Sequence, residues 1–269
     1  MKGHYLHVKG VLVAALKDEY NKVIALKGKW GTGKTFLWDE IKREMYGGDN
    51  KPIYVSLFGA KTLSDLKLRI LQNSFSSDKK SFNKINKAAE SILSTGFSVV
   101  KHLFGISAED TALIGLPLLV SDRLVVIDDI ERKHLDLDVD ELLGFLDEYS
   151  EIYRVRFLIV LNTDKLIDVE VWHTLHEKVI DFEVTLKPTP AESFDVAFEG
   201  DSWIYKEEVR SAISILGVNN IRVIERILRV VKYVHENQID SDISAKNWVP
   251  SCALLTACYF KALDNPPSF

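Results

Sequence analysis

Apolar residues recur along this chain in two patterns, as short strand-like segments and as longer segments with helical spacing. The strand-like segments cover residues 22–27, 52–57, 123–127, 156–161 and 179–186, and those at 123–127 and 156–161 contain continuous apolar runs. Continuous apolar runs are typical of strands buried on both faces of a parallel sheet. Between them, apolar residues recur every three or four positions, which predicts helices over residues 5–20, 34–46 and 139–153 and another that begins at Thr62. Strands that alternate with helices predict a parallel α/β domain.

The pattern changes after Pro188 and Pro190, because no further strand-like run follows them. Helical spacing continues over residues 194–198, 205–216, 221–235 and 251–263. We therefore predict two domains, an α/β core over residues 1–187 and a small all-helical domain over residues 188–269. A segment at 76–121 interrupts the core. It opens with a polar, basic stretch that we expect to be a loop, and the rest resembles a mostly helical insertion.

One segment between a predicted strand and a predicted helix carries a specific motif. Residues 28–35 read Gly-Lys-Trp-Gly-Thr-Gly-Lys-Thr, the pattern of a phosphate-binding loop. Its glycines let successive N–H groups converge on an anion, and the following helix adds its positive end. A glycine-rich surface turn is the alternative, and the flanking strand and helix argue against it. The residues expected to contact nucleotide are Gly28, Lys29, Trp30, Gly31, Thr32, Gly33, Lys34, Thr35 and Phe36.

Two residues of this loop carry the chemistry of nucleotide binding. Lys34 is expected to reach the β- and γ-phosphates, and the Thr35 hydroxyl is expected to complete a Mg²⁺ shell. The predicted fold is therefore that of a P-loop NTPase, with a parallel central sheet flanked by helices and followed by a small helical lid domain.

Polar residues follow two of the predicted strands. In a parallel sheet the carboxyl ends of the strands open onto the ligand crevice. Asp128, after a buried run, is our candidate for the Mg²⁺ carboxylate, and Asp129 is the candidate that orients the attacking water. Glu131 competes with Asp129 for that role. Asn162 closes the next buried strand and is placed to hydrogen-bond the γ-phosphate or the water. A turn residue is the alternative reading of Asp128 and Asn162, and a solvated acid that of Glu131.

Composition narrows the class of protein. The chain has 269 residues, of which 46% are hydrophobic, and a net charge of −5. The acidic balance argues against extensive sequence-independent nucleic-acid binding. Cys252 and Cys258 form neither a CxxC pair nor a disulfide framework, so we predict two reduced, buried thiols in a cytoplasmic protein. The histidines show no metal spacing beyond the weak pair His173 and His176. The longest clean apolar run of the insertion covers only residues 113–120, and spanning a bilayer takes ~18 residues.

Five motifs in succession resemble the KAP family of P-loop NTPases, which is related to the AAA+ and STAND ATPases. They read GKWGTGKT, VVIDDIER, IVLNTDKL, EKVIDFEV and NNIRVIERIL, and they extend over residues 23–228. The resemblance implies that Asn162 is sensor 1 and that Arg222, in the lid, is sensor 2. Arg226 and Arg229 share the helical face of Arg222, so either can replace it in this role, and a basic face that pairs with surface acids is the alternative. Arg132 follows the acids and acts either across a subunit boundary or in a surface ion pair.

The resemblance also implies a function. We expect a Mg²⁺-dependent ATPase that couples nucleotide state to conformational change or oligomerisation, possible roles in such families including bacterial anti-phage defence. Adenine is favoured by the family, and the chain lacks an Asn-Lys-x-Asp guanine motif at the corresponding strand ends. The expected partners are other copies of the chain or a separate effector protein. KAP proteins often carry transmembrane helices between these motifs, whereas the insertion here has no span of sufficient length, so membrane contact is not expected.

Two other functions stay open at this stage. The first is a switch that binds nucleotide tightly and hydrolyses it little, which is favoured by the Asp128-Asp129 pair because a glutamate commonly occupies the second position. The second is a DNA-handling motor or loader. Its support is one cluster of basic residues in the insertion, for which a solvated loop is the alternative: Lys79, Lys80, Lys84 and Lys87.

Overall fold

The computed structural model describes residues 3–47, 51–77, 115–117, 119–162, 176–198, 203–237 and 244–263. The chain forms two compact units. The first, here called the lid unit, consists of Met1–Gly10, Gly28–Leu37 and Thr185–Phe269. The second, the sheet unit, consists of Val11–Lys27 and Trp38–Val184. The predicted domain boundary at residue 187 stays a prediction.

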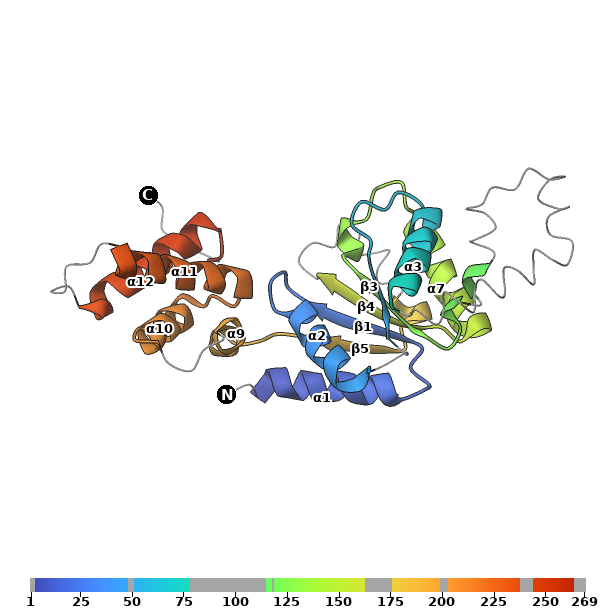
Figure 1. Cartoon of the computed structure of the whole chain (residues 1–269), viewed down its shortest axis with the longest axis horizontal. Coiled ribbons are helices and arrows are strands. Elements are labelled where there is room, and N and C mark those ends of the chain that lie inside the picture. Colours follow the sequence, from blue (N-terminus) through green and yellow to red (C-terminus); the bar gives the residue numbers. More distant parts are fainter. Residues whose placement is uncertain are drawn as a thin grey trace, which may run out of the picture. The chain divides into compact units, whose positions relative to one another are not determined.

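A five-stranded sheet forms the centre of the α/β part (Figure 1). Its strands, in spatial order, are β2 (Ile53–Ser56), β3 (Leu124–Asp128), β4 (Arg156–Asn162), β1 (Val23–Gly28) and β5 (Phe182–Thr185). β2 and β4 flank β3 in parallel register, with Ile53 and Phe157 both opposite Val125. Every residue of β3 is buried, as expected for a central strand covered on both faces. The parallel fold predicted from the apolar runs is confirmed.

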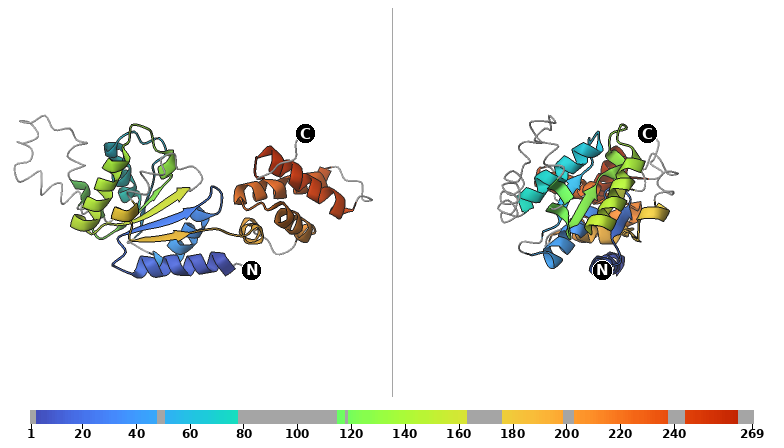
Figure 2. Two further views of the ribbon diagram at one scale, coloured as in Figure 1. Left: turned by 180° about the vertical axis from the view of Figure 1, so that it is seen from behind. Right: turned by 90° about the vertical axis from the view of Figure 1, so that its right-hand side faces the viewer.

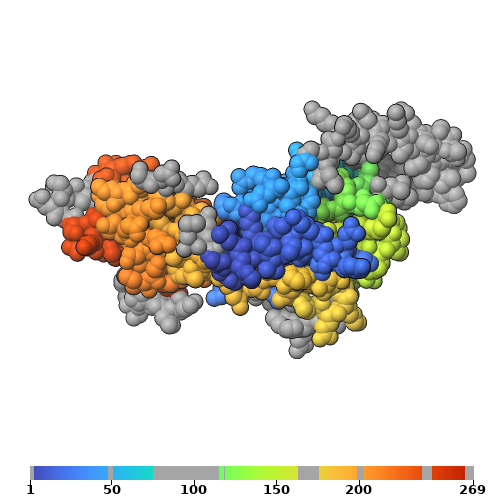
Figure 3. Space-filling model, turned by 90° about the horizontal axis from the view of Figure 1, so that it is seen from below, coloured from blue at the N-terminus to red at the C-terminus, as the bar shows by residue number. Residues whose placement is uncertain are grey.

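Helices cover both faces of the sheet. Figures 1 and 2 show α3 (Leu63–Ser77) and α7 (Val139–Tyr153) on one face, and α1 (Gly3–Lys17) and α2 (Lys34–Met45) toward the other. The α3–α7 face buries one continuous core that includes Leu66, Phe145 and Phe157. Figure 3 shows the outer side of α1, in dark blue, on the molecular surface.

Local sequence signals account for the ends of these helices. Asp138 accepts a hydrogen bond from the Asp140 N–H and caps α7. At the start of α3, the Thr62 hydroxyl accepts from the Asp65 N–H while the Asp65 carboxylate accepts from the Thr62 N–H, a reciprocal cap. Thr62 therefore begins this helix as predicted.

Two predicted boundaries in the sheet unit are wrong. The expected strand over 179–186 is shorter, because residues 176–179 are helical and only Phe182–Thr185 form β5. Val179 and Ile180 pack against the core from outside the strand, so their apolar character reflects burial and not pairing. The loop expected from residue 76 does not begin there, since α3 continues through Ser77. Most of the predicted insertion lies outside the described residues, and so do Lys79, Lys80, Lys84 and Lys87.

Helices alone make up the described part of the chain from residue 190 onward, as predicted. They are α9 (Pro190–Ala197), α10 (Lys206–Leu216), α11 (Ile221–Asn237) and α12 (Ala245–Tyr259). They bury a separate core around Phe194, Ile213 and Ile227. Thr189 and Glu192 form a capping box at the start of α9, and Pro190 takes the first helical position.

Two predictions about the last helix need correction. We expected it to begin at residue 251, after Pro250, yet α12 begins at Ala245 and includes Pro250. Proline removes one helical N–H, and tertiary packing of α12 on the lid core outweighs that loss. Cys252 and Cys258 are free thiols as predicted, but both are half-buried and not fully buried. Burial raises the pKa of the Cys252 thiol, which keeps it protonated at neutral pH.

Candidate functional site

The phosphate-binding loop connects β1 to α2 and belongs to the lid unit. Gly31 and Gly33 have φ angles of 82° and 91°, in the left-handed region that favours glycine. At Gly28, a Cβ atom would approach the Leu186 carbonyl oxygen to 2.7 Å, so this position also requires glycine. The glycines of the motif therefore fix the path of the backbone.

Lys34 holds this loop from within. Its side chain is buried, and its Nζ donates hydrogen bonds to the carbonyl oxygens of Gly28 and Lys29, each at 2.9 Å. The Thr32 hydroxyl donates to the same Lys29 carbonyl at 2.9 Å. Helix α2 begins at Lys34, so the residue that carries the ammonium group also stands at the positive end of the helix dipole. Both positive charges favour an anion at this loop.

Thr35 and Phe36 lie in the first turn of α2. Thr35 is exposed, so its hydroxyl is accessible to a metal ion or water. The Phe36 ring is half-buried and packs against Tyr5, with a distance of 6.4 Å between the ring centroids. Phe36 thus has a packing role in the lid unit in addition to its expected place near the nucleotide.

Helix α11 of the lid contacts the loop through its first residues. The Ile221 N–H donates to the Gly31 carbonyl at 2.8 Å, and Asn220 Nδ2 donates to the Trp30 carbonyl at 3.3 Å. The Arg222 guanidinium lies 4.9 Å from the Trp30 ring centroid, in a cation–π contact. The structure therefore brings the predicted sensor 2 residue to the phosphate-binding loop within one compact unit.

The other two arginines of the predicted basic face have different partners. The Arg226 guanidinium stacks over Phe260 at 4.1 Å, and Arg229 Nε donates to the Glu225 carbonyl of its own helix at 3.3 Å. Among the three candidates, Arg222 is the one that the described residues show in contact with the loop.

At the carboxyl end of β3, Asp128 is buried and hydrogen-bonded. Tyr54 donates its hydroxyl proton to Oδ2 at 2.5 Å, and the Asp129 N–H donates to Oδ1 at 2.7 Å. Burial raises the pKa of Asp128; these two hydrogen bonds oppose the rise, and the charges of Asp129 and Glu131 add to it. The net shift is upward, so the ionised carboxylate is held in surroundings that disfavour its charge.

Asp129 adopts a left-handed backbone conformation with φ 59°. Its carboxylate accepts a hydrogen bond from the Ser56 hydroxyl at 2.9 Å and lies 3.6 Å from Arg132 Nη1. The Arg132 guanidinium also stacks over the Phe58 ring at 3.9 Å. Arg132 is thus engaged in a surface ion pair, which was one of its two expected roles.

Asn162 and Glu131 are joined directly. The Asn162 N–H donates to Glu131 Oε2 at 3.3 Å, and its side-chain amide donates to Glu131 Oε1. Glu131 lies on a short 3₁₀ helix, η2 (Ile130–Arg132), that follows Asp129. Both candidates for the water-handling role therefore have partners, Ser56 and Arg132 for Asp129, and Asn162 for Glu131.

Three residues that contact these candidates were not predicted from the sequence. Asn220 contacts the phosphate-binding loop, and Tyr54 and Ser56 contact the acids after β3. A signal for Ser56 was present, because it lies at the carboxyl end of a predicted strand, as Asp128 does. Asn220 directly precedes a predicted helix, which is the N-cap position that asparagine favours. Tyr54 gave no such signal, since its partner Asp128 is 74 positions away in the sequence.

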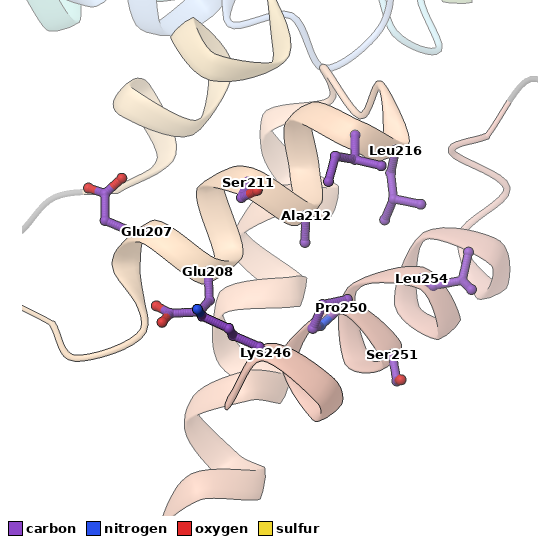
Figure 4. Close-up of a pocket in the computed structure, with 10 residues that line it drawn as sticks. Glu207, Glu208, Ser211, Ala212, Leu216, Lys246, Pro250, Ser251 and Leu254 are labelled. Carbon is purple, nitrogen blue, oxygen red and sulfur yellow. The ribbon is translucent and has the colours of Figure 1, made fainter. Parts of the chain in front are cut away.

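Among the described residues, no group of three or more His, Cys, Asp or Glu side chains could hold a metal ion. His173 lies outside those residues, and His176 pairs with Glu183. A groove of about 570 Å³ lies between α10 and α12 in the lid (Figure 4). It is lined by apolar residues such as Leu254 and by Glu207, Glu208 and Lys246, and contains none of the predicted nucleotide residues.

The segment with the phosphate-binding loop is similar in sequence to a known family of proteins. Residues 8–108 match the KAP family P-loop domain. The resemblance predicted from the motifs is thus confirmed for the segment that contains the phosphate-binding loop. Among curated proteins, no sequence matches. Within the described residues, no helix has the length and the apolar character of a membrane span.

Solved structures with the same fold are distant in sequence. Orc1 from Aeropyrum pernix, solved in complex with DNA, is 16% identical, with a TM-score of 0.55 over 96% of this chain and 65% of that chain. Cdc6p from Pyrobaculum aerophilum is 15% identical, with a TM-score of 0.52 over 88% and 62% of the two chains. Domain III of the Thermotoga maritima replication initiation protein DnaA is 11% identical, with a TM-score of 0.50 over 98% and 94%. The chain spans under two thirds of the Orc1 and Cdc6p chains, and the similarity concerns the fold.

Proposed function

We propose that this protein binds ATP with Mg²⁺ at residues 28–36 and hydrolyses it, and that the helical lid converts nucleotide state into conformational change or oligomerisation. The observation that carries the proposal is the buried Lys34 ammonium inside a glycine loop, at the junction of β1 and α2. The match of this segment to the KAP family P-loop domain supports it.

The residues present suit a magnesium ion. Thr35 and Asp128 offer hydroxyl and carboxylate oxygens, the hard donors that Mg²⁺ prefers. Burial raises the pKa of Asp128 and the charges of Asp129 and Glu131 add to the rise, so a divalent cation would favour the ionised form of this carboxylate. Mg²⁺ keeps several waters and phosphate oxygens as ligands, so it does not need a cluster of three or more protein ligands. When bound, the ion neutralises charge on the phosphates.

The remaining roles follow from charge and hydrogen-bonding capacity. Lys34 binds the phosphates and stabilises the charge that develops on them, with Arg222 as the second cation. Asp129 orients the attacking water, and Glu131 is the competing residue because it shares hydrogen bonds with Asn162. Asn162, as sensor 1, then transmits the presence or absence of the γ-phosphate to Glu131 through its two hydrogen bonds to that residue.

Steady-state turnover of Mg²⁺-ATP tests this proposal. We expect Lys34→Ala to abolish turnover and Asp129→Asn to reduce it roughly 100-fold, with Glu131→Gln as the matched comparison. A larger loss in Glu131→Gln than in Asp129→Asn would move the water-handling role to Glu131. Turnover that persists in Lys34→Ala would contradict the proposal as a whole.

A nucleotide-gated switch is the second candidate. It is favoured by the partners of Asp129, since a carboxylate that is bonded to Ser56 and paired with Arg132 is poorly available to a water molecule. The switch would be supported over the ATPase if the wild type binds ATP tightly with negligible turnover and Lys34→Ala loses this binding.

We also propose a role in bacterial anti-phage defence, which rests on the KAP resemblance alone. Plaque counts on bacteria that express the wild type or Lys34→Ala test it. Equal counts with both proteins and with an empty control would contradict the role.

A further inference from the structure

One lid residue, Asn220, joins the phosphate-binding loop to helix α11. Its Nδ2 donates to the Trp30 carbonyl at 3.3 Å. Its Oδ1 accepts from the N–H of Arg222 at 3.1 Å and from that of Val223 at 3.4 Å, which caps the helix. The same side chain therefore serves a loop carbonyl with its donor end and a helix terminus with its acceptor end.

The backbone next to Asn220 makes a second connection. Ile221 is the first residue of α11, and its N–H donates to the Gly31 carbonyl at 2.8 Å. The first N–H groups of a helix have no partner within the helix. Here the Gly31 carbonyl accepts from the first of these groups and the Asn220 side chain accepts from the next two, so three successive N–H groups of α11 have acceptors at residues 31 and 220.

Packing makes the contact tight. A Cβ atom on Gly31 would overlap the Asn220 side chain, and one on Gly33 would approach Ile221 Cδ1 to 2.6 Å. The Arg222 guanidinium over the Trp30 ring adds a third contact between the same two segments. Each of these contacts lies within the lid unit.

The geometry of the peptide bond gives these contacts a consequence for the loop. In a planar trans peptide, the N–H points opposite to the carbonyl of the same unit. Fixing the carbonyls of Trp30 and Gly31 therefore fixes the direction of the Gly31 and Thr32 N–H groups. In a phosphate-binding loop it is such N–H groups that converge on the anion.

We infer that Asn220 is a positioning residue that ties the conformation of the phosphate-binding loop to the N-terminus of α11. A change in the loop then moves the start of α11, and a displaced α11 distorts the loop. The role of this tie in sensing nucleotide rests on the proposed function. The tie itself is a property of the protein alone, so it can be tested with and without ATP.

Asn220→Asp separates the two ends of the side chain. Aspartate caps a helix as well as asparagine does, but it cannot donate to the Trp30 carbonyl. Asn219→Asp is the matched control, since it adds the same charge one residue earlier. The Asn219 carbonyl, which accepts from the Ser193 hydroxyl, is unchanged by that substitution.

Hydrogen exchange without nucleotide is the first measurement. In Asn220→Asp we expect the amides of Thr32 and Ile221, which donate to Lys29 and Gly31, to exchange about tenfold faster, a factor equivalent to about 1.4 kcal/mol. The amides of Arg222 and Val223 should keep their protection because the cap is retained. Asn219→Asp should exchange as the wild type does. Unchanged exchange at Thr32 and Ile221 in Asn220→Asp would overturn the inference.

Exchange with and without Mg²⁺-ATP is the second measurement. In the wild type, ATP should alter the exchange of the α11 amides at residues 221–223, and in Asn220→Asp this response should be lost while ATP still binds. A full response in Asn220→Asp would overturn the coupling. If the wild type binds no ATP, the proposed function fails, and the first measurement still decides whether Asn220 ties the loop to α11.

Discussion

Two carboxylates with nearly equal solvent exposure have pKa values that are shifted in opposite directions in this molecule. Asp128 ends β3 in the sheet unit and is 8% exposed, and Glu192 lies in the first turn of α9 in the lid unit and is 7% exposed. Glu192 accepts hydrogen bonds from the N–H groups of His4, Tyr5 and Thr189 and from the Thr189 hydroxyl. Asp128 accepts from Tyr54 and from one N–H, beside two other acids.

The pKa shifts follow from these surroundings. Burial acts to raise the pKa of Glu192, but the hydrogen bonds from Thr189, His4 and Tyr5 outweigh it, and the pKa is lowered. Burial raises the pKa of Asp128, and its two hydrogen bonds do not offset the rise. Glu192 has enough hydrogen-bond donors within the fold to favour its ionised form, whereas Asp128 does not. The proposed Mg²⁺ role of Asp128 would supply the positive charge that its surroundings lack.

Asp128→Asn is expected to have the largest effect among the substitutions that test this difference between Asp128 and Glu192. Because the ionised Asp128 is disfavoured in the folded protein, we expect the free energy of unfolding to stay the same or rise. Turnover of Mg²⁺-ATP should fall roughly 100-fold, since a metal carboxylate is lost. Urea unfolding and steady-state kinetics measure the two effects. A stability loss as large as the activity loss would place Asp128 with Glu192 as a structural acid.

The second test is Glu192→Ala, which removes the acceptor of one buried N–H group, that of Tyr5, and of two partly buried ones, those of His4 and Thr189. We expect the free energy of unfolding to fall by roughly 3 kcal/mol at neutral pH. Urea denaturation measures this loss. Asp195→Ala on the same helix is the control, because it removes a partly exposed ion pair with Arg210 that is worth about 1 kcal/mol or less. Equal losses in the two variants would contradict the structural role of Glu192.

The smallest expected effect is the pH dependence of the Glu192 contribution. Its folded pKa lies below the unfolded value of 4.5, so its stabilisation is fully present above 4.5 and is lost as pH falls through the folded pKa. The stability gap between the wild type and Glu192→Ala should therefore narrow from neutral pH toward about pH 3. Urea midpoints at several pH values measure it. A gap that stays constant would show that the charge of Glu192 contributes nothing.

The sequence predicted best what neighbouring residues determine. The phosphate-binding loop lies in eight consecutive positions, Gly28 to Thr35. The side-chain hydrogen bonds from Thr32 and Lys34 to the loop carbonyls stay within the same eight residues. Helix α7 has the predicted bounds because Asp138 caps it locally. The apolar runs gave the strands since burial on both faces leaves a continuous hydrophobic signature.

What the sequence left open depends on contacts between distant segments. Tyr54 reaches Asp128 only when β2 pairs with β3, and Asn220 reaches Trp30 across 190 positions. Glu192 reads locally as one half of a capping box, and its bond to the His4 N–H spans 188 positions. The helical spacing over residues 251–263 missed the first turns of α12, which begins at Ala245 and includes Pro250, because packing in the lid outweighs the low helix propensity of proline.

The close approach of Gly28, Gly31 and Gly33 to other parts of the protein makes these glycines necessary for folding, independently of nucleotide binding. Gly28 is required by the Leu186 carbonyl oxygen, and Gly31 and Gly33 are required by their left-handed backbone conformation beside the Asn220 and Ile221 side chains. A mutational scan selected on cellular abundance, without any demand for activity, should therefore reject substitutions at these glycines and accept them at the exposed Thr35. A descendant that had lost nucleotide binding would keep the glycines of the motif and lose its threonine first.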